Sequence, residues 1–146
     1  MLGRIDHVGY IAADLEQGVA TFTERLGAEV VRRFERRQFS LVGVYLGAEG
    51  GNIEVFSFTE PELLAARTGG RALALDHVAY EVADMRATEE TLRAQGIGFC
   101  GPDLRDELTE AVDLGGVLHI WTRPATCSGV ALQLMQRVVS LTLAAE

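Results

Sequence analysis

Cysteine is scarce in this sequence. Its 146 residues include two cysteines, Cys100 and Cys127, which are not arranged as a Cys-x-x-Cys pair. Two isolated cysteines fit a reducing compartment better than a disulfide framework, which needs larger and more closely spaced sets. We therefore expect a cytoplasmic protein.

Positive charge and long apolar runs are lacking as well. The formal net charge is -8, which argues against nucleic-acid binding, because phosphate contacts need a basic surface. The first residues show neither the charged region nor the apolar stretch of a secretory signal. The apolar run at residues 138–145 is too short to cross a bilayer. We expect no nucleic-acid partner and no membrane segment.

The composition is that of a globular protein. Hydrophobic residues make up 48% and charged residues 23% of the chain, which is enough apolar material for a proper core. The length matches one ordinary domain, and two halves of about seventy residues would each be marginal alone. We therefore predict a single domain, residues 1–146, that consists of a module at 1–58, a connector at 59–71, a second module at 72–136 and a C-terminal tail at 137–146.

One short phrase occurs twice in the chain. The segment IDHVGY at residues 5–10 returns as LDHVAY at residues 75–80, and both copies run on into an Ala-Asp pair. The repeat sets His7 and His77 at equivalent points of two apolar, strand-like runs. A duplicated unit with one histidine per copy indicates a pseudo-symmetric site where the copies meet. Such a pair is a natural start for a metal site.

The pattern of each copy predicts the order β-α-β-β-β. In the first copy, residues 4–12 alternate like a strand, Asp14 caps a helix to about residue 26, and three strands follow between residues 28 and 58. In the connector, Pro61 opens a short helix that two glycines close. The second copy predicts a strand at 72–82, a helix capped by Asp84 to about residue 95, a looser segment to residue 110, and strands at 111–114, 117–122 and 130–136.

Alternation along the strands separates a few polar side chains from the face that a helix should cover. His7 alternates with apolar residues on the first strand, Glu54 alternates with apolar residues on the last strand of the first copy, and Gln133 does so on the last strand of the second. Each module thus offers a histidine on its first strand and a polar chelating side chain on its last strand. Together with His77, these are four ligands from symmetric places.

The repeat and its flanking motifs resemble the vicinal oxygen chelate superfamily, which includes glyoxalase I, extradiol dioxygenases and fosfomycin-resistance enzymes. Within it, the sequence is most similar to the methylmalonyl-CoA epimerase family: it has IDHVG near the start, a Gly-Gly connector before LDHVAYEV, and Pro124 followed nine positions on by Gln133 and Leu134. The likeness covers nearly the whole chain. It implies an α+β fold in which two paired βαβββ modules form a cup of curved mixed sheet.

The resemblance also implies a metal site and a reaction class. His7, Glu54, His77 and Gln133 would bind one divalent cation, whose identity among zinc, cobalt, nickel, manganese and iron(II) the ligand types do not decide. The implied function is that of a metal-dependent isomerase or lyase, in which the metal holds negative charge on an enolate oxygen while a carboxylate moves a proton α to a carbonyl. A 2+ ion with one carboxylate leaves the ligand set near +1, which favours an anionic substrate of the acyl-CoA or oxo-acid type.

The chain departs from the family pattern at its proton-transfer groups. The last-strand position, usually a glutamate that binds metal and serves as a base, is Gln133 here, and an amide cannot accept and return a proton at neutral pH. Glu54 is then the carboxylate of the ligand set, and we assign it the catalytic role. No acidic residue lies between residues 36 and 48, so Glu35 is the nearest candidate for a second base.

Other residues remain open to two interpretations. Arg123 stands where the family often has a histidine before Pro124, and His119 has no counterpart in the first module, so we consider both as substrate-binding residues beside a structural role. The four arginines at 32, 33, 36 and 37 could contact a phosphate of a CoA-like group or form a solvated strand end. The apolar tail at residues 138–143 could pack against a partner subunit, which favours a homodimer.

Two further functions remain as alternatives to the isomerase. One is a glyoxalase-type lyase that acts on a thiol adduct. The other is a non-catalytic protein of the same fold that binds a small molecule, as drug-resistance members of the superfamily do.

Overall fold

The computed structural model describes residues 1–48 and 50–138. Its contacts divide the chain into two compact units. The N-terminal unit is Asp6–Val78, and the C-terminal unit combines Met1–Ile5 with the described residues from Ala79 on. From residue 139 on, the tail to which we assigned a dimer contact lies outside the described residues.

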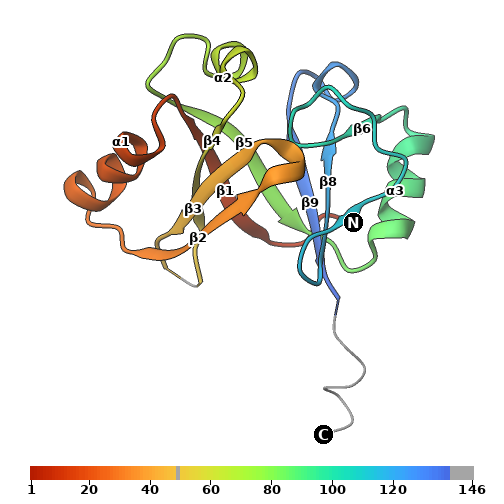
Figure 1. The fold of residues 1–146 in the computed structure, drawn as a ribbon. Coiled ribbons are helices and arrows are strands. Elements are labelled where there is room, and N and C mark those ends of the chain that lie inside the picture. Colours follow the sequence, from red (N-terminus) through yellow and green to blue (C-terminus); the bar gives the residue numbers. More distant parts are fainter. Residues whose placement is uncertain (49, 139–146) are drawn as a thin grey trace, which may run out of the picture. The chain divides into compact units, whose positions relative to one another are not determined.

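Strands outnumber helices throughout the described chain, and Figure 1 shows their order. The strands are β1 (Ile5–Ala12), β2 (Val30–Arg36), β3 (Leu41–Leu46), β4 (Ile53–Phe58), β5 (Leu73–Glu81), β6 (Phe99–Cys100), β7 (Val112–Asp113), β8 (Val117–Thr122) and β9 (Leu132–Arg137). The helices are α1 (Leu15–Ala20), continued by a π-helical turn η1 (Thr21–Arg25), α2 (Pro61–Thr68), α3 (Met85–Ala94), and the 3-10 turns η2 (Arg37–Phe39) and η3 (Pro124–Thr126). Among the described residues, we find no helix with the length and apolar character that a membrane span requires.

The N-terminal unit is built on a mixed sheet in the order β2-β3-β4-β1-β5. The pairs β2/β3 and β3/β4 are antiparallel, and β1/β4 is parallel. With α1 between β1 and β2, this is the βαβββ order that the sequence predicted, and the predicted α+β fold class is confirmed. The strand that carries Glu54, β4, therefore lies inside the sheet rather than at its edge.

Helix α1 covers one face of this sheet. Asp14 begins the helix, because its carboxylate accepts a hydrogen bond from the backbone N–H of Gln17 at 3.0 Å. The apolar residues of the helix then pack onto alternate residues of β1, β3 and β4. The buried members of this core are Ala12, Val19, Phe22, Val44, Leu46 and Val55.

The opposite face of the same sheet carries a second apolar cluster and, beside it, polar side chains. The buried apolar members are Ile11, Leu41, Phe56, Phe58 and, from α2, Leu63. On β1 and β4, side chains two residues apart share a face. His7 therefore shares the face of Ile11, and Glu54 shares the face of Phe56 and Phe58.

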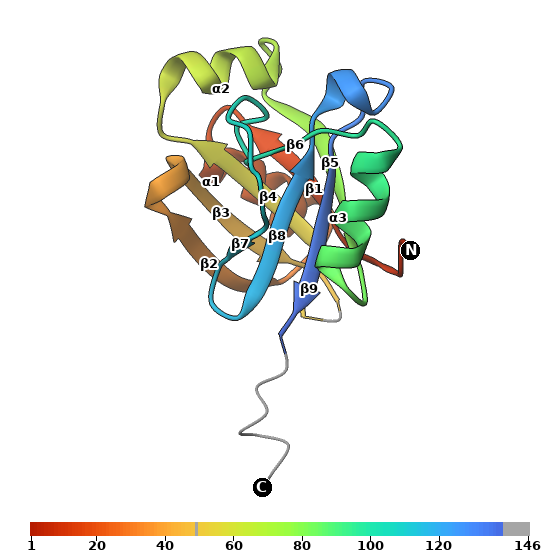
Figure 2. The ribbon, with the colours of Figure 1, turned by 90° about the vertical axis from the view of Figure 1, so that its right-hand side faces the viewer.

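The C-terminal unit pairs the end of β5 with β9, β9 with β8, and β8 with both β6 and β7. Figure 2 shows α3 beside β9, and its core contains Val82, Met85, Phe99, Ile120 and Leu134. The sequence predicted every one of these elements except β6, which falls in the segment assigned as loose. A strand of two residues is too short to show any periodicity.

At Gly18, helix α1 lies close against the sheet. A Cβ at this position would lie 2.6 Å from the Cβ of Ala12 and 3.1 Å from Cγ1 of Val55. The Ala12 methyl cannot move without its strand, and Ala12 is fully buried. Helix α1 can therefore sit at its observed depth only because residue 18 has no side chain.

We predict that Gly18→Ala lowers the free energy of unfolding by about 1–3 kcal/mol through overpacking. The same change in an exposed helix would stabilise by about 1 kcal/mol, so the sign of the effect tests the packing. Urea unfolding followed by circular dichroism measures it. Adding Ala12→Gly to Gly18→Ala removes the facing methyl and should recover part of the loss, whereas a stabilised single variant would contradict the close approach.

Candidate metal centre

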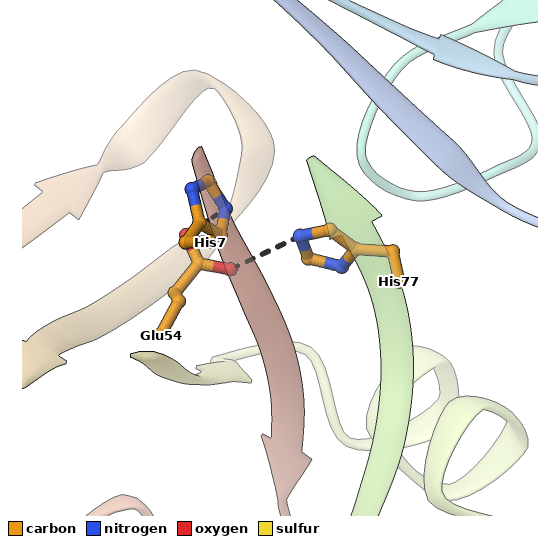
Figure 3. Close-up of side chains that lie close together, drawn as sticks. All are labelled: His7, Glu54 and His77. Atoms are coloured by element: carbon orange, nitrogen blue, oxygen red, sulfur yellow. Dashed lines mark ion pairs between the residues drawn. The ribbon is translucent and has the colours of Figure 1, made fainter. Parts of the chain in front are cut away.

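Three ionisable side chains meet on the face of the N-terminal sheet that lies opposite α1. His7 comes from β1, Glu54 from β4 and His77 from β5 (Figure 3). One ligand atom from each residue lies within 4.8 Å of those of the other two. All three are buried, with exposed fractions of 0%, 6% and 6%. Three of the four predicted metal ligands are thus brought together.

The two imidazoles turn the same nitrogen toward the carboxylate. Nε2 of His77 lies 3.3 Å from Oε1 of Glu54, and Nε2 of His7 lies 3.8 Å from Oε2. Both Nε2 atoms are buried and make no hydrogen bond of acceptable geometry within the described residues. Buried polar atoms of this kind are rare unless something else satisfies them. Two neutral imidazoles and one carboxylate suit a first-row divalent cation, so the residues present fit a metal ion.

An aspartate precedes each histidine and orients its ring. Nδ1 of His7 lies 2.8 Å from Oδ2 of Asp6, and Nδ1 of His77 lies 2.8 Å from Oδ2 of Asp76. An ionised carboxylate can only accept hydrogen bonds, so Nδ1 of each histidine carries a proton and donates the hydrogen bond to the aspartate. The lone pair of a neutral ring then stays on Nε2, the atom that faces Glu54. This arrangement is typical of histidines that bind metal.

The His77 arm has a further support from α2. Arg67 donates two hydrogen bonds to Asp76, from Nε to Oδ1 at 2.9 Å and from a terminal nitrogen to Oδ2 at 3.0 Å. Its guanidinium also lies over the ring of Phe58 at 5.3 Å. Burial tends to raise the pKa of Asp76, but His77 and Arg67 outweigh it and hold the pKa below its ordinary value. Asp76 is therefore ionised, and its two hydrogen bonds from Arg67 hold it in position beside His77.

Electrostatics make the metal-free cluster an ion pair. For Glu54, burial alone would raise the pKa, but His7, His77 and Tyr45 lower it below its ordinary value. For His77, burial alone would lower the pKa, yet the carboxylates of Asp76 and Glu54 raise it from 6.5 to about 9. At neutral pH the metal-free cluster thus holds a carboxylate beside a protonated His77.

Tyr45 belongs to the site although the sequence analysis did not single it out. It is the cross-strand partner of Glu54 in the β3/β4 register, and its ring lies 5.3 Å from that of His7 in an edge-to-face arrangement. Burial, followed by the Glu54 charge, raises the pKa of its hydroxyl well above the ordinary value. It therefore stays a neutral donor. The alternation of residues along β3 could have placed Tyr45 on the face of the site. A tyrosine among apolar strand residues, however, is more readily interpreted as a core residue.

Gly9 leaves the space that the His77 ring occupies. A Cβ on Gly9 would lie 2.2 Å from Cε1 and 2.5 Å from Nε2 of His77. Gly9 is also the register partner of Glu54 on the adjoining strand. The backbone of β1 thus forms the floor of the cluster, and any side chain there would displace an imidazole.

The fourth predicted ligand, Gln133, belongs to the C-terminal unit. Its amide nitrogen lies 2.8 Å from Nδ1 of His119, and both side chains are buried. The His119 ring stacks on Trp121 with centroids 6.0 Å apart. Arg123 donates a hydrogen bond to the backbone oxygen of Arg105 at 3.1 Å. The assignments of Gln133 to the metal and of His119 and Arg123 to substrate stay predictions.

Glu35, the candidate for a second base, lies on the other face of the sheet. In the β2/β3 register it pairs with Val42, whereas Phe34 pairs with Gly43. The ring of Phe34 lies 5.0 Å from that of Tyr45, on the face of the cluster. Glu35 alternates with it and forms an ion pair with Arg37 at 3.4 Å. Strand alternation thus turns the carboxylate of Glu35 away from His7 and Glu54, and the nearest candidate for a second base in the sequence does not reach the cluster.

The chain matches a known family in sequence and known structures in fold. Residues 6–112 match the model of the glyoxalase/bleomycin resistance protein/dioxygenase superfamily. The chain belongs to this superfamily. The resemblance read from the two histidine motifs is therefore confirmed, and with it the expected fold. No curated protein matches the chain in sequence.

Solved structures of other proteins show the same fold. The chain is similar to methylmalonyl-CoA epimerase from Mycobacterium tuberculosis, with a TM-score of 0.77 and 20% identity over 97% of this chain and 91% of that one. A Streptomyces coelicolor methylmalonyl-CoA epimerase variant in complex with 2-nitronate-propionyl-CoA gives a TM-score of 0.78 and 20% identity over 95% and 100%. A methylmalonyl-CoA epimerase in complex with methylmalonyl-CoA and NH4+ gives 0.76 and 21% over 93% and 95%. At these identities the likeness establishes the fold.

We predict that Gly9→Ala weakens binding of zinc or cobalt by about tenfold or more, the range typical of changes that misplace a ligand. The added methyl would occupy the position of the His77 ring. Competition with a chromophoric chelator measures the affinity, and circular dichroism checks that the fold is kept. Gly98→Ala is the matched control, because a Cβ there meets no atom closer than 3.5 Å. Equal affinities of the two variants would contradict the placement of His77.

We predict that metal affinity rises with pH up to about 9, the folded pKa of His77, and levels off above it. The folded pKa is raised, so the proton on His77 stabilises the metal-free fold below pH 6.5, and this contribution is lost as the pH passes about 9. A metal ion must displace that proton. Calorimetric titration in buffers of different ionisation enthalpy measures the protons released. An affinity that stays constant up to about pH 9 would contradict the raised pKa.

Proposed function

We propose that this protein is a metal-dependent enzyme that removes a proton α to a carbonyl group and stabilises the resulting enolate. Its substrate is an anionic thioester of the acyl-CoA type, in the manner of methylmalonyl-CoA epimerase. The observation that carries the proposal is the buried group of His7, Glu54 and His77, in which both Nε2 atoms are without a hydrogen-bond partner in the described part of the chain.

The two histidines and Glu54 hold the metal in this proposal. A protein that used them only for structure would leave Nε2 of His7 buried and unsatisfied, at a cost of about 1–3 kcal/mol, and would keep a buried proton on His77 beside Glu54. The aspartates fix each ring so that Nε2 points toward Glu54. When bound, a divalent cation supplies a positive charge that stabilises negative charge on a carbonyl oxygen. We retain Gln133 as the proposed fourth ligand.

Glu54 is the proposed base. Its lowered pKa keeps the carboxylate ionised at neutral pH, so it can accept a proton. The Tyr45 hydroxyl, a neutral donor on the neighbouring strand, stabilises the carboxylate and limits its movement. The cluster is buried, which excludes water from an enolate and strengthens each charge interaction.

A single carboxylate gives specific support to one alternative. In the N-terminal unit, Glu54 is the carboxylate beside the imidazoles that is not already bonded to a histidine Nδ1. One base can move a proton between adjacent carbons, as in a glyoxalase-type reaction on a thiol adduct, whereas inversion at one carbon needs a donor on the opposite face. The alternative of a non-catalytic binding protein gains nothing from a ligand set of this kind.

We also propose the assembly and setting that the sequence indicated. The chain acts as one domain, residues 1–146, as a homodimer in the cytoplasm, on a small-molecule substrate. The similarity of nearly the whole chain to solved epimerase structures supports the single domain.

We predict that metal-loaded wild-type protein exchanges the α-proton of methylmalonyl-CoA with D2O, and that Glu54→Gln slows this exchange by about a hundredfold or more. The amide keeps the shape of the side chain but cannot accept a proton. Mass spectrometry of the recovered thioester measures deuterium incorporation. Absence of exchange by the wild type rejects this substrate.

Two controls separate the alternatives. The double variant His7→Ala with His77→Ala should lose both metal and exchange, while a wild type purified without metal, and unable to bind it, would favour the non-catalytic reading. Turnover of methylglyoxal with a thiol, but no exchange on the thioester, would favour the glyoxalase-type reaction.

A further inference from the structure

Four arginines lie within six consecutive residues, and strand alternation divides them. Arg32, Arg33 and Arg36 belong to β2, and Arg37 begins the turn that follows. In the register with β3, Arg32 pairs with Tyr45, while Arg33 pairs with Val44. Tyr45 lies on the face of the metal centre and Val44 in the core beneath α1. Arg32 and Arg36 therefore share the face of His7, and Arg33 points to the helix.

The two faces differ in how the positive charge is neutralised. Arg33 forms a double hydrogen bond with Glu16 of α1 at 2.6 and 3.1 Å, and Arg37 pairs with Glu35. Within residues 1–48 and 50–138, neither Arg32 nor Arg36 has a carboxylate partner. In a chain with a net charge of -8, two cations without an acidic partner are held on the face of the sheet that carries His7, Glu54 and His77.

Aromatic rings hold both of these guanidinium groups in place. Arg32 lies over the ring of Tyr45 at 4.5 Å, and Arg36 lies over the ring of Phe34 at 5.2 Å. The two rings are themselves 5.0 Å apart. A guanidinium that stacks on a ring keeps its N–H groups free at its edge for a bidentate contact with an anion. Stacking thus orients the two side chains. One terminal nitrogen of Arg36 also donates a hydrogen bond to the backbone oxygen of Glu35 at 3.3 Å, and its other donors are left for an anion.

The stacked side chains of Tyr45, Phe34, Arg32 and Arg36 extend from the metal centre to the edge of the sheet. Tyr45 contacts His7 on one side and carries Arg32 on the other, and β2 is the edge strand of the N-terminal unit. Arg32 and Arg36 are four residues apart, which corresponds to about 13 Å along a strand. A ligand with its reacting end at Glu54 and anionic groups some distance away could contact both.

We propose that Arg32 and Arg36 form an anion subsite for the phosphate groups of a thioester substrate whose acyl end lies at His7, Glu54 and His77. This inference rests on the proposed function, since it assigns a binding site to the phosphate groups of the same substrate. Phosphates match the subsite because each presents several oxygens to a planar fork of donors. Arg32 is exposed and Arg36 partly so, which suits a handle that stays at the surface while the thioester is buried.

Binding of a matched pair of ligands tests the subsite without any turnover. Acetyl-CoA and S-acetylpantetheine carry the same thioester, but only the first has phosphates. We expect Arg32→Gln and Arg36→Gln each to weaken acetyl-CoA binding about tenfold, the effect of one lost charge-assisted bond, and to leave S-acetylpantetheine binding unchanged. Arg33→Gln removes the same charge from the same strand and should change acetyl-CoA binding less than about twofold. Isothermal calorimetry on the metal-loaded protein measures all of these affinities.

The outcomes divide cleanly. Equal losses for Arg32→Gln and Arg33→Gln would mean that only net charge acts, and this would overturn the subsite. If the variants lose as much affinity for S-acetylpantetheine as for acetyl-CoA, the subsite is overturned too. The same holds if their weaker binding arises only because the molecules associate with one another through the edge strand β2. Arginine-dependent binding of acetyl-CoA without α-proton exchange supports the subsite and rejects the proposed reaction. Exchange on methylmalonyl-CoA with affinities unchanged in both variants rejects the subsite alone.

Discussion

The structure of the N-terminal unit depends on the burial of three ionisable side chains next to one another. His7, Glu54 and His77 lie on one face of a five-stranded sheet with almost no exposure, where an unpaired charge would be strongly unfavourable. Without metal, a proton on His77 balances Glu54. With a cation, the same atoms become ligands. Proton and metal therefore compete for one buried position, and the aspartates behind the imidazoles serve both states.

The surrounding packing follows from this requirement. An imidazole can stand beside Glu54 only where β1 has no side chain, which accounts for Gly9. The flat ring of Tyr45 covers the other side of His7 and contributes a polar donor from an apolar strand. Beyond the cluster, the same face is closed by phenylalanines and by α2. The helix-covered face carries none of these polar groups, so α1 can pack tightly against it.

Much of this arrangement could be predicted from the sequence, because repeats and alternation are local signals. The repeat identified His7 and His77, and alternation on a strand identified Glu54. Register is not local, and for this reason Tyr45 was missed and Glu35 was named as the nearest candidate for a second base although its strand turns it to the other face. The β2/β3 pairing decides both positions, yet a one-residue shift of the strand would have reversed them. Strand β6 was missed because two residues carry no period, and the partners of Gln133 depend on contacts across β8 and β9.

The two halves of the site are duplicated in their ligands but not in their supports. Both histidines bond to a preceding aspartate at the same 2.8 Å, which the repeat preserves. Only one copy is followed along the chain by a position that cannot bear a Cβ: the repeat has Gly9 where its second copy has Ala79. Likewise, Arg67 comes from the connector helix, a segment outside the repeated units, and clamps Asp76 from there. The symmetry of the ligands therefore reflects duplication, while their rigidity comes from segments that are specific to each copy. A ligand pair supported in this unequal way can bind one cation and still present two chemically different sides to a substrate.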